Sequence, residues 1–285
     1  MSAVQVMTTT LMLSRIVVVI PTKDRPTKLA RAISSVYAQS ILPHLLIVVG
    51  EKDSDLEAVR RDGDPSGGKK VPQAFLVNRR ARNLSGSVNT AFTHLLEQDF
   101  EPQLTYVSLL DDDDEWEPKY LQKCIELASN QNLDWVIAGI TRHEAEDGEG
   151  INLSIPKLLK ASQFLITNPH VQGSNLFVRF ATLLKAGCFD ENLRSTTDRD
   201  LCIRLLNLGD TRVGLVREHL VHHMASGLDR LSTPGSEAKR NGLIAFYQKY
   251  NLAMLAQERD GFVHRATTVF HCTASDFQST TSGSN

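Results

Sequence analysis

Five consecutive acidic residues, Asp111 to Glu115, follow directly on the apolar segment of residues 105–110 (TYVSLL). A run of acids usually lies on a solvated face, but this one stands where a buried strand is expected to end, and its charges repel one another unless a cation compensates. Carboxylates in D-x-D spacing suit Mg²⁺ or Mn²⁺, which proteins hold with one or two carboxylates plus substrate phosphates. The run therefore predicts a metal site, and the alternative is an acidic helix N-terminus ahead of Pro118.

A second pair of carboxylates, Asp198 and Asp200, flanks Arg199 at the start of a helix predicted around residues 200–207. Acids at a helix N-terminus are favourable by about 0.3–1 kcal/mol each, so the pair has a structural explanation. In the functional alternative, one carboxylate accepts the proton of an attacking hydroxyl, which is worth about 10²–10⁴ in rate.

The elements that must position these acids alternate along the first half of the chain. Short apolar runs predict strands at residues 16–20, 45–49, 74–77, 105–110 and 135–140. Helical spacing of apolar residues predicts helices around residues 29–37, 88–96 and 118–128, and farther on around 237–250. This alternation predicts an α/β fold, a mainly parallel sheet flanked by helices in a single large domain, with ligands bound at the carboxyl ends of the strands.

Composition excludes several classes of protein. Among 285 residues, 31 Lys and Arg against 33 Asp and Glu give a net charge of -2, which argues against a general nucleic-acid binder. The four cysteines lie far apart, so we expect neither a disulfide scaffold nor a zinc ribbon, and a cytoplasmic location. We expect no transmembrane segment and no signal peptide. Residues 63–70 lack P-loop spacing and are expected to form a surface loop, as is the acidic stretch 144–152.

Four segments together resemble family 2 glycosyltransferases of the GT-A fold. They are the opening IVVVIPTKDRPTKLARAISSVYAQS, the box LSGSVNTAF, the acidic strand and helix YVSLLDDDDEWEPKYL, and the segment TTDRDLCIRLLNLG. The resemblance covers roughly residues 15–230. It implies a nucleotide-sugar-binding half over residues 15–140 and an acceptor-binding half over residues 141–273. From the residues themselves, we expect a flexible leader (1–14) and a disordered tail (274–285).

The resemblance also implies a donor, a nucleotide-diphosphate sugar with a UDP-sugar favoured, and a cation, Mg²⁺ or Mn²⁺. Asp113 is the first choice for direct metal ligation, with Asp111 at the metal's water or the ribose. The other donor-binding candidates are Pro21, Thr22, Asp24, Arg25, Glu51, Arg82 (or Arg79), Asn89 and Asp112. Glu51 stands where the family usually shows Asp-Asp, and Ser87-Val88-Asn89 stands where Ala-Arg-Asn is common.

On the acceptor side, the resemblance aligns Asp198 with the family's catalytic base, with Asp200 as the alternative, and implies an inverting reaction. The acceptor is an unidentified hydroxyl compound, with His170, Gln172 and Asn175 as candidate neighbours. His223 or His222 would complete the metal shell from a loop after residues 213–216, and Arg230 would contact the diphosphate; packing or solvation of these side chains is the alternative. Trp116 and Trp135 are expected to pack, although Trp116 could stack on a sugar.

Two other functions remain open from the sequence. A nucleotidyltransferase shares the acid–metal chemistry, but it would need a glycine-rich loop after the first strand, and residues 21–26 contain no glycine. A catalytically silent nucleotide-sugar-binding protein would keep the D-x-D segment without turnover. The Gln-x-x-Arg-Trp segment of processive synthases is absent, and Arg204-Leu205-Leu206 stands there instead, so transfer of a single sugar is expected.

Overall fold

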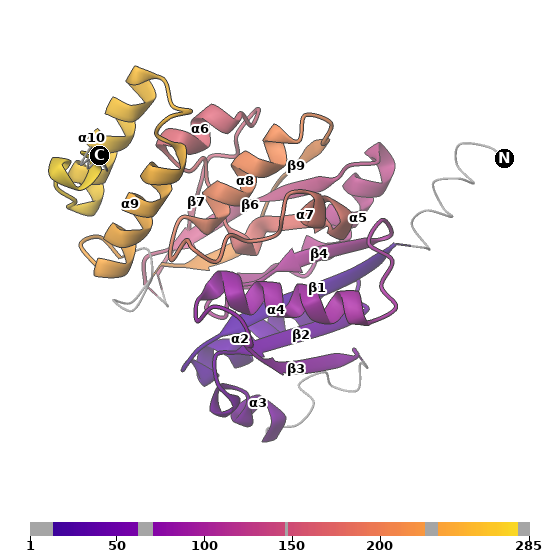
Figure 1. The fold of residues 1–285 in the computed structure, drawn as a ribbon. Helices are drawn as coiled ribbons and strands as arrows, with labels where there is room; N and C mark the ends of the chain where they lie inside the picture. Colours follow the sequence, from indigo (N-terminus) through magenta and orange to yellow (C-terminus); the bar gives the residue numbers. More distant parts are fainter. Residues whose placement is uncertain (1–13, 62–70, 146–147, 226–232, 279–285) are drawn as a thin grey trace.

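The computed structural model describes residues 14–61, 71–145, 148–225 and 233–278. Its strands form one sheet in the order β3-β2-β1-β4-β8-β6-β9-β5, with β7 paired to β6 (Figure 1). The strands are β1 (Arg15–Thr22), β2 (Leu45–Gly50), β3 (Gln73–Val77), β4 (Thr105–Leu109), β5 (Glu115–Trp116), β6 (Trp135–His143), β7 (Ile151–Asn152), β8 (Leu176–Arg179) and β9 (Val213–Met224).

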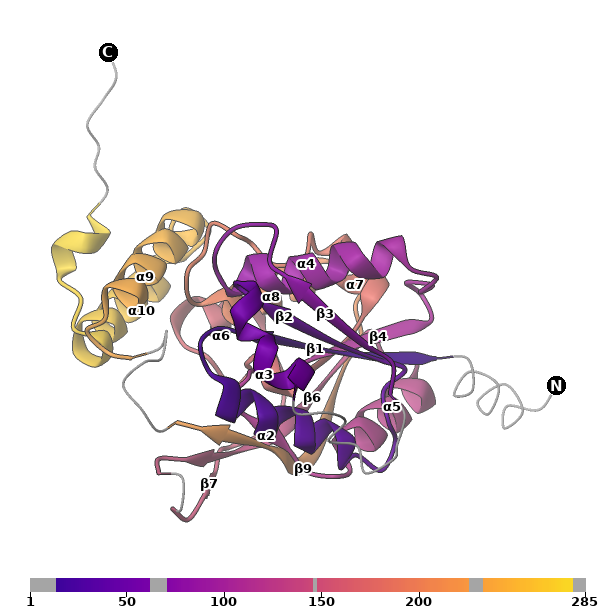
Figure 2. The ribbon, with the colours of Figure 1, turned by 90° about the horizontal axis from the view of Figure 1, so that it is seen from below.

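Helices cover both faces of this sheet. Figure 2 shows α2 and α5 on one face and α4, α7 and α8 on the other. The helices are α2 (Pro26–Tyr37), α3 (Glu57–Arg61), α4 (Leu84–Glu97), α5 (Tyr120–Gln131), α6 (Ala161–Ile166), α7 (Phe180–Lys185), α8 (Thr197–Asn207), α9 (Glu237–Tyr250) and α10 (Ala256–Phe270). The described residues also form the 3₁₀ helices η1 (Asp53–Asp55), η2 (Gly173–Asn175) and η3 (Ala274–Phe277).

Strand β1 shows why the apolar runs form central strands. Successive side chains of a strand point to opposite faces, and both faces are covered here. Val17 and Val19 pack in the core beneath α4, whereas Val18 and Ile20 pack in the core with α2 and α5. The strands β1 to β4 are joined by parallel pairings, so their carboxyl ends meet at one edge of the sheet.

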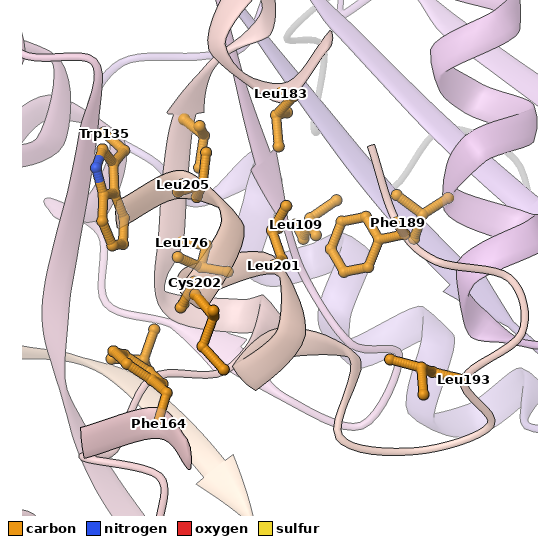
Figure 3. Close-up of a cluster of buried hydrophobic side chains, with 14 of the residues drawn as sticks. Leu109, Trp135, Phe164, Leu176, Leu183, Phe189, Leu193, Leu201, Cys202 and Leu205 are labelled. Atoms are coloured by element: carbon orange, nitrogen blue, oxygen red, sulfur yellow. The ribbon is translucent and has the colours of Figure 1, made fainter. Parts of the chain in front are cut away.

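Helix α8 is fixed to the middle of the sheet by a buried cluster. Figure 3 shows Leu201, Cys202 and Leu205 of α8 facing Leu109 of β4 and Leu176 of β8, in the cluster that also includes Trp135. Cys202 and Leu205 are fully buried. This packing sets where the first turn of α8, which carries Asp198, lies relative to the end of β4.

The predicted fold class, a mixed α/β sheet with flanking helices in one domain, is confirmed, although parallel pairing dominates only in the N-terminal half. Strand β8 runs antiparallel between β4 and β6, and β5 and β7 also pair antiparallel. Strands β6 and β9 are parallel, with register shifts near Gly139.

The structure differs from the sequence prediction at two places. Residues 151–152, predicted to lie in an exposed loop, form β7 and pair with β6. The predicted tail begins too early, because residues 274–277 form η3 and Phe277 is buried. The leader up to residue 13, the loop 63–70 and the end of the tail from residue 279 lie outside the described residues.

Within the described ranges, no helix is both long enough and apolar enough to cross a bilayer.

Candidate functional site

A cavity of about 690 Å³ opens at the carboxyl ends of β1 and β4. Its walls come from segments that are far apart in the sequence: Pro21 near the end of β1 and Arg25 after it, the acids 111–113 after β4, Asp198 on α8, and His223 on β9. This is the edge at which parallel α/β sheets bind ligands.

The negative charge of the acidic wall, formed by Asp111 to Asp113, is partly compensated by residues at the end of β1 and the start of α2. Thr22 Oγ1 donates a hydrogen bond to Asp112 Oδ2 at 2.7 Å, and Arg25 Nη1 lies 3.1 Å from Asp112 Oδ1 and 3.0 Å from Asp113 Oδ2. Lys28 Nζ lies 3.7 Å from the same Asp113 oxygen. The charges of the acid run are therefore partly balanced by helix α2.

Asp111 and Asp113 are the carboxylates of this wall that suit a cation. Burial, together with the neighbouring charge of Asp114 and the other acids, raises the pKa of Asp111 well above its usual value. In the part of the chain that the structure describes, no group of three or more His, Cys, Asp or Glu side chains is arranged to hold a metal by itself. Mg²⁺ usually needs only one or two carboxylates, with phosphates and water as its other ligands, so the two aspartates fit a cation shared with a diphosphate.

Asp114, which the sequence analysis did not single out, holds His223 in place. The Asp114 carboxylate is fully buried, and it accepts hydrogen bonds from Ser174 Oγ at 2.6 Å and Met224 N at 3.1 Å. His223 Nδ1 lies 3.0 Å from Asp114 Oδ1. A carboxylate that fixes one imidazole nitrogen leaves the other nitrogen available as a ligand, an arrangement common around metal-binding histidines.

The two histidines lie on strand β9 and not in a loop, so they point to opposite faces. His223 lines the cavity. His222 does not: its Nδ1 lies 2.9 Å from His143 Nε2, and its Nε2 lies 2.8 Å from Glu117 Oε1. The structure therefore brings only His223 to the acidic wall, and Arg230 lies outside the described residues.

Asp198 lies beside the same wall, next to the backbone of Gly173. A Cβ atom on Gly173 would lie 3.4 Å from Asp111 Oδ1 and 3.8 Å from Asp198 Oδ1, so a larger residue there would crowd the space between the two carboxylates. Asp198 Oδ1 is buried and has no hydrogen-bond partner within the described ranges. Burial raises the pKa of Asp198 to about 6, although the nearby Lys239 opposes this shift.

Asp200 does not line the cavity. It is completely buried on another side of α8, where its Oδ2 lies 2.7 Å from Arg204 Nη2 and its Oδ1 accepts a hydrogen bond from Tyr250 at 2.7 Å. Lys249 forms a further ion pair with it. These contacts tie α8 to α9, which is a structural role.

The candidates Asp24 and Glu51 also lie away from the cavity walls. Asp24 forms an ion pair with Lys52 at 2.6 Å. Glu51 Oε1 accepts hydrogen bonds from Asn78 Nδ2 at 2.8 Å and Ser87 Oγ at 2.9 Å.

The box around Asn89 connects α4 to the segment before α8. Asn89 is buried, and its side chain donates to Phe189 O and Glu191 Oε1, both at 2.8 Å. Arg79 and Arg82 are exposed and do not line this cavity.

Three side chains were predicted on the acceptor side, and the structure brings two of them to the cavity. His170 and Gln172 line it, and Gln172 Nε2 is a buried donor without a partner among the described residues. Asn175 is fully buried and donates to Ala138 O and His170 O, so it supports the loop. Trp116 and Trp135 pack as predicted, with Trp116 stacked on Tyr120 and only 3% exposed.

Several basic residues of the cavity were missed. They are Arg142 on β6, Arg194 before α8, Lys239 on α9 and Arg265 on α10. They come from separate segments of the sequence, and no spacing connects them before the chain is folded.

Comparisons with known proteins identify the family and the fold. The model of the family described as glycosyl transferase family 2 matches residues 17–185. Residues 1–349 of TarS from S. aureus, in complex with UDP-GlcNAc, are similar in structure, with a TM-score of 0.64, 16% identity, and coverage of 90% of this chain and 73% of that chain. Mannosyltransferase PcManGT from Pyrobaculum calidifontis, in complex with GDP-Man and Mn²⁺, gives a TM-score of 0.57 and 15% identity over 92% of this chain and 72% of that chain. No curated protein matches the sequence.

The family model covers more than half of the chain. The structural neighbours share its GT-A fold, with the sheet and flanking helices described above. The predicted enzyme class, a glycosyltransferase, is therefore confirmed. The chain belongs to glycosyl transferase family 2.

Proposed function

We propose that this protein transfers a single sugar from a nucleotide-diphosphate sugar to an acceptor hydroxyl, with inversion at the anomeric carbon and with the help of Mg²⁺ or Mn²⁺. The observation that carries the proposal is the position of Asp198. Its unpartnered carboxylate oxygen shares one cavity with the acidic wall at the end of β4. The complexes of the two neighbours with UDP-GlcNAc and with GDP-Man and Mn²⁺ support a nucleotide-sugar donor.

In this proposal the donor lies along the end of β1. Pro21 and Arg25 line the part of the cavity next to the acidic wall, and Thr22 holds the Asp112 carboxylate there. Asp113 and Asp111 would hold the cation, with His223, oriented by Asp114, as a third candidate ligand. A bound divalent cation would neutralise the charge of the departing diphosphate.

Asp198 would act as the general base. The acceptor oxygen attacks the anomeric carbon, the bond from that carbon to the diphosphate oxygen breaks, and the acceptor proton moves to Asp198. A nucleoside diphosphate leaves with the electron pair of the broken bond. A base with a pKa near 6 is ionised at neutral pH and still basic enough to assist, which suits this role.

Transfer of one sugar is also supported by the segment Arg204-Leu205-Leu206. Arg204 is paired with Asp200, and Leu205 is completely buried in the cluster of Figure 3, so this turn of α8 packs the fold. It presents no aromatic residue that could hold a growing polymer.

A binding and turnover experiment tests the proposed function. UDP and GDP are screened by thermal shift with and without Mn²⁺, and the matching nucleotide sugars are then assayed for release of nucleoside diphosphate over a panel of hydroxyl acceptors. We expect one nucleotide to raise the melting temperature only together with the metal, because a ligand bound by the folded state stabilises it. Metal-dependent binding without release over the whole panel would instead favour a silent binding protein.

A further inference from the structure

The end of the cavity formed by α9 and α10 is basic. Lys239 on α9 and Arg265 on α10 line the same cavity as Asp198, together with Arg194. Both of these side chains contact the Phe270 ring, whose centroid lies 4.6 Å from Lys239 Nζ and 5.6 Å from Arg265 Cζ. The cavity thus has an acidic wall at the end of β4 and a basic wall, formed by Lys239, Arg265 and Arg194.

Lys239 is the most unusual of these cations, because it is only 8% exposed. Among the residues described, no acidic side chain forms an ion pair with Lys239, Arg194 or Arg265. Burial and the neighbouring Arg199 lower the pKa of Lys239 to about 8, although the charge of Asp198 opposes this shift, so Lys239 is still mostly charged at neutral pH. Removing an unpaired ammonium group from water is costly, and a bound anion would compensate that cost.

The position of the basic wall assigns the anion to the acceptor and not to the donor. The donor side already has cations of its own, Arg25 and Lys28, and a metal site at the acidic wall. Next to the basic wall lie two unpartnered buried groups, Asp198 Oδ1 and Gln172 Nε2, which can accept from and donate to a hydroxyl compound.

We propose that the acceptor is a phosphate-bearing alcohol, whose phosphate is bound by Lys239 and Arg265 while its hydroxyl lies at Asp198. This inference rests on the proposed function for the role of Asp198. A phosphate is favoured over a carboxylate because its second negative charge and third oxygen match a wall with several cations.

The test measures binding of three probes by NMR titration: glycerol 3-phosphate, glycerate and glycerol. Each is titrated into the protein alone and into the protein saturated with Mg²⁺ and UDP, or GDP if that nucleotide is the one that binds. We expect glycerol 3-phosphate to bind about tenfold more tightly than the other two probes, and its affinity to stay within about twofold when nucleotide is present. Lys239→Gln should weaken glycerol 3-phosphate about tenfold and change nucleotide affinity by less than about twofold.

Arg240→Gln is the matched control. It removes one cation from the next position of α9, where Arg240 pairs with Asp276 and does not line the cavity. It should leave all three affinities unchanged. If Lys239→Gln does not fold, Arg265→Gln replaces it with the same expectation.

Equal binding of the three probes, or equal binding of glycerate and glycerol 3-phosphate, would overturn the inference. Loss of glycerol 3-phosphate binding when nucleotide is added would also overturn it, and so would a Lys239→Gln variant that loses nucleotide binding instead. Either result would place the donor diphosphate at the basic wall. The titrations without nucleotide test whether the basic wall binds the phosphate, even if no nucleotide binds. Failure of the proposed function would show instead in the nucleotide experiments, so the two failures can be told apart.

Discussion

At the scale of single residues, the proposed function depends on two aspartates, Asp113 and Asp198, whose surroundings differ. Asp113 is held by Arg25 and Lys28 at the mouth of the donor side, whereas Asp198 has a buried oxygen with no partner in the described part of the chain. Cations beside a carboxylate can also contact phosphates, so Asp113 suits a site that binds a divalent cation and phosphates together. A carboxylate oxygen without a hydrogen-bond partner, as in Asp198, is suited to accept a proton.

The pH dependence of stability follows from Asp198. Burial raises its pKa from 3.8 to about 6, with Lys239, Gly173 N–H and His223 opposing this shift and Asp114 adding to it. As pH rises from 4 to 6, the unfolded chain loses this proton before the folded one does, so the folded state is penalised by up to about 3 kcal/mol above pH 6. Asp198→Asn should therefore raise the melting temperature of the metal-free protein at pH 7 and leave it unchanged near pH 4. A variant that melts lower at pH 7 would contradict this.

Asp113 should matter for the nucleotide and little for the fold. Asp113→Asn removes one acid from a repelling run, and Arg25 keeps its contact with Asp112. We expect a melting temperature close to that of the native protein without ligands and loss of the metal-dependent shift with nucleotide. Glu115→Gln, which changes an acid of the same run that does not line the cavity, should keep that shift. Loss of the metal-dependent melting-temperature shift in both variants would mean that the net charge of the acidic run, and not Asp113 itself, determines binding.

At the scale of elements, strand β9 decides which histidine reaches the site. Because side chains alternate along a strand, His223 faces Asp114 and the cavity, and His222 faces Glu117 and His143. His223→Gln should weaken binding of nucleotide in the presence of metal, measured by calorimetry. His222→Gln should leave it within about twofold. Equal losses of nucleotide affinity in the two variants would mean that the integrity of strand β9, and not the His223 imidazole, determines nucleotide binding.

Helix α8 separates the two acids of its first turn into different roles. Asp200 is buried against Arg204, Lys249 and Tyr250. Asp200→Asn removes the carboxylate that pairs with Arg204, whereas Lys249 keeps its ion pair with Asp190, so we expect a loss of about 2 kcal/mol or more in unfolding free energy. Activity per folded molecule should stay near native, and denaturant unfolding with turnover at low temperature checks both. A stable but inactive variant would return Asp200 to the catalytic candidates.

At the scale of the whole molecule, the sequence predicted one half better than the other. Strands β1, β2 and β4 are largely apolar runs buried on both faces, and such runs stand out without knowledge of their partners. Strand β8 has four residues, and β9 mixes charged and apolar residues, so neither shows a clear period. These two segments become strands because they pair with neighbouring strands of the sheet, which the local sequence pattern does not reveal.

The site divides in the same way. Asp111 and Asp113 were singled out because they follow an apolar run, and Asp198 because of the family resemblance; the structure brings all three to one cavity, and their roles stay predictions. The basic wall could not be predicted, because Arg194, Lys239 and Arg265 come from separate segments and meet only in the folded chain. The role of Asp114 was hidden for the same reason, since His223 is distant from it in sequence.

The proposed division of the site gives Asp198 to the acceptor and the end of β4 to the donor. It is tested most directly by measuring, for Asp198→Asn and the native protein, both the affinity for nucleotide with Mn²⁺ and the rate of nucleoside diphosphate release with a verified acceptor. We predict an affinity within about twofold of native and a rate lower by about 10²-fold or more, the size expected when general-base help is lost. An Asp198→Asn variant that binds nucleotide and turns over at the native rate would contradict the account.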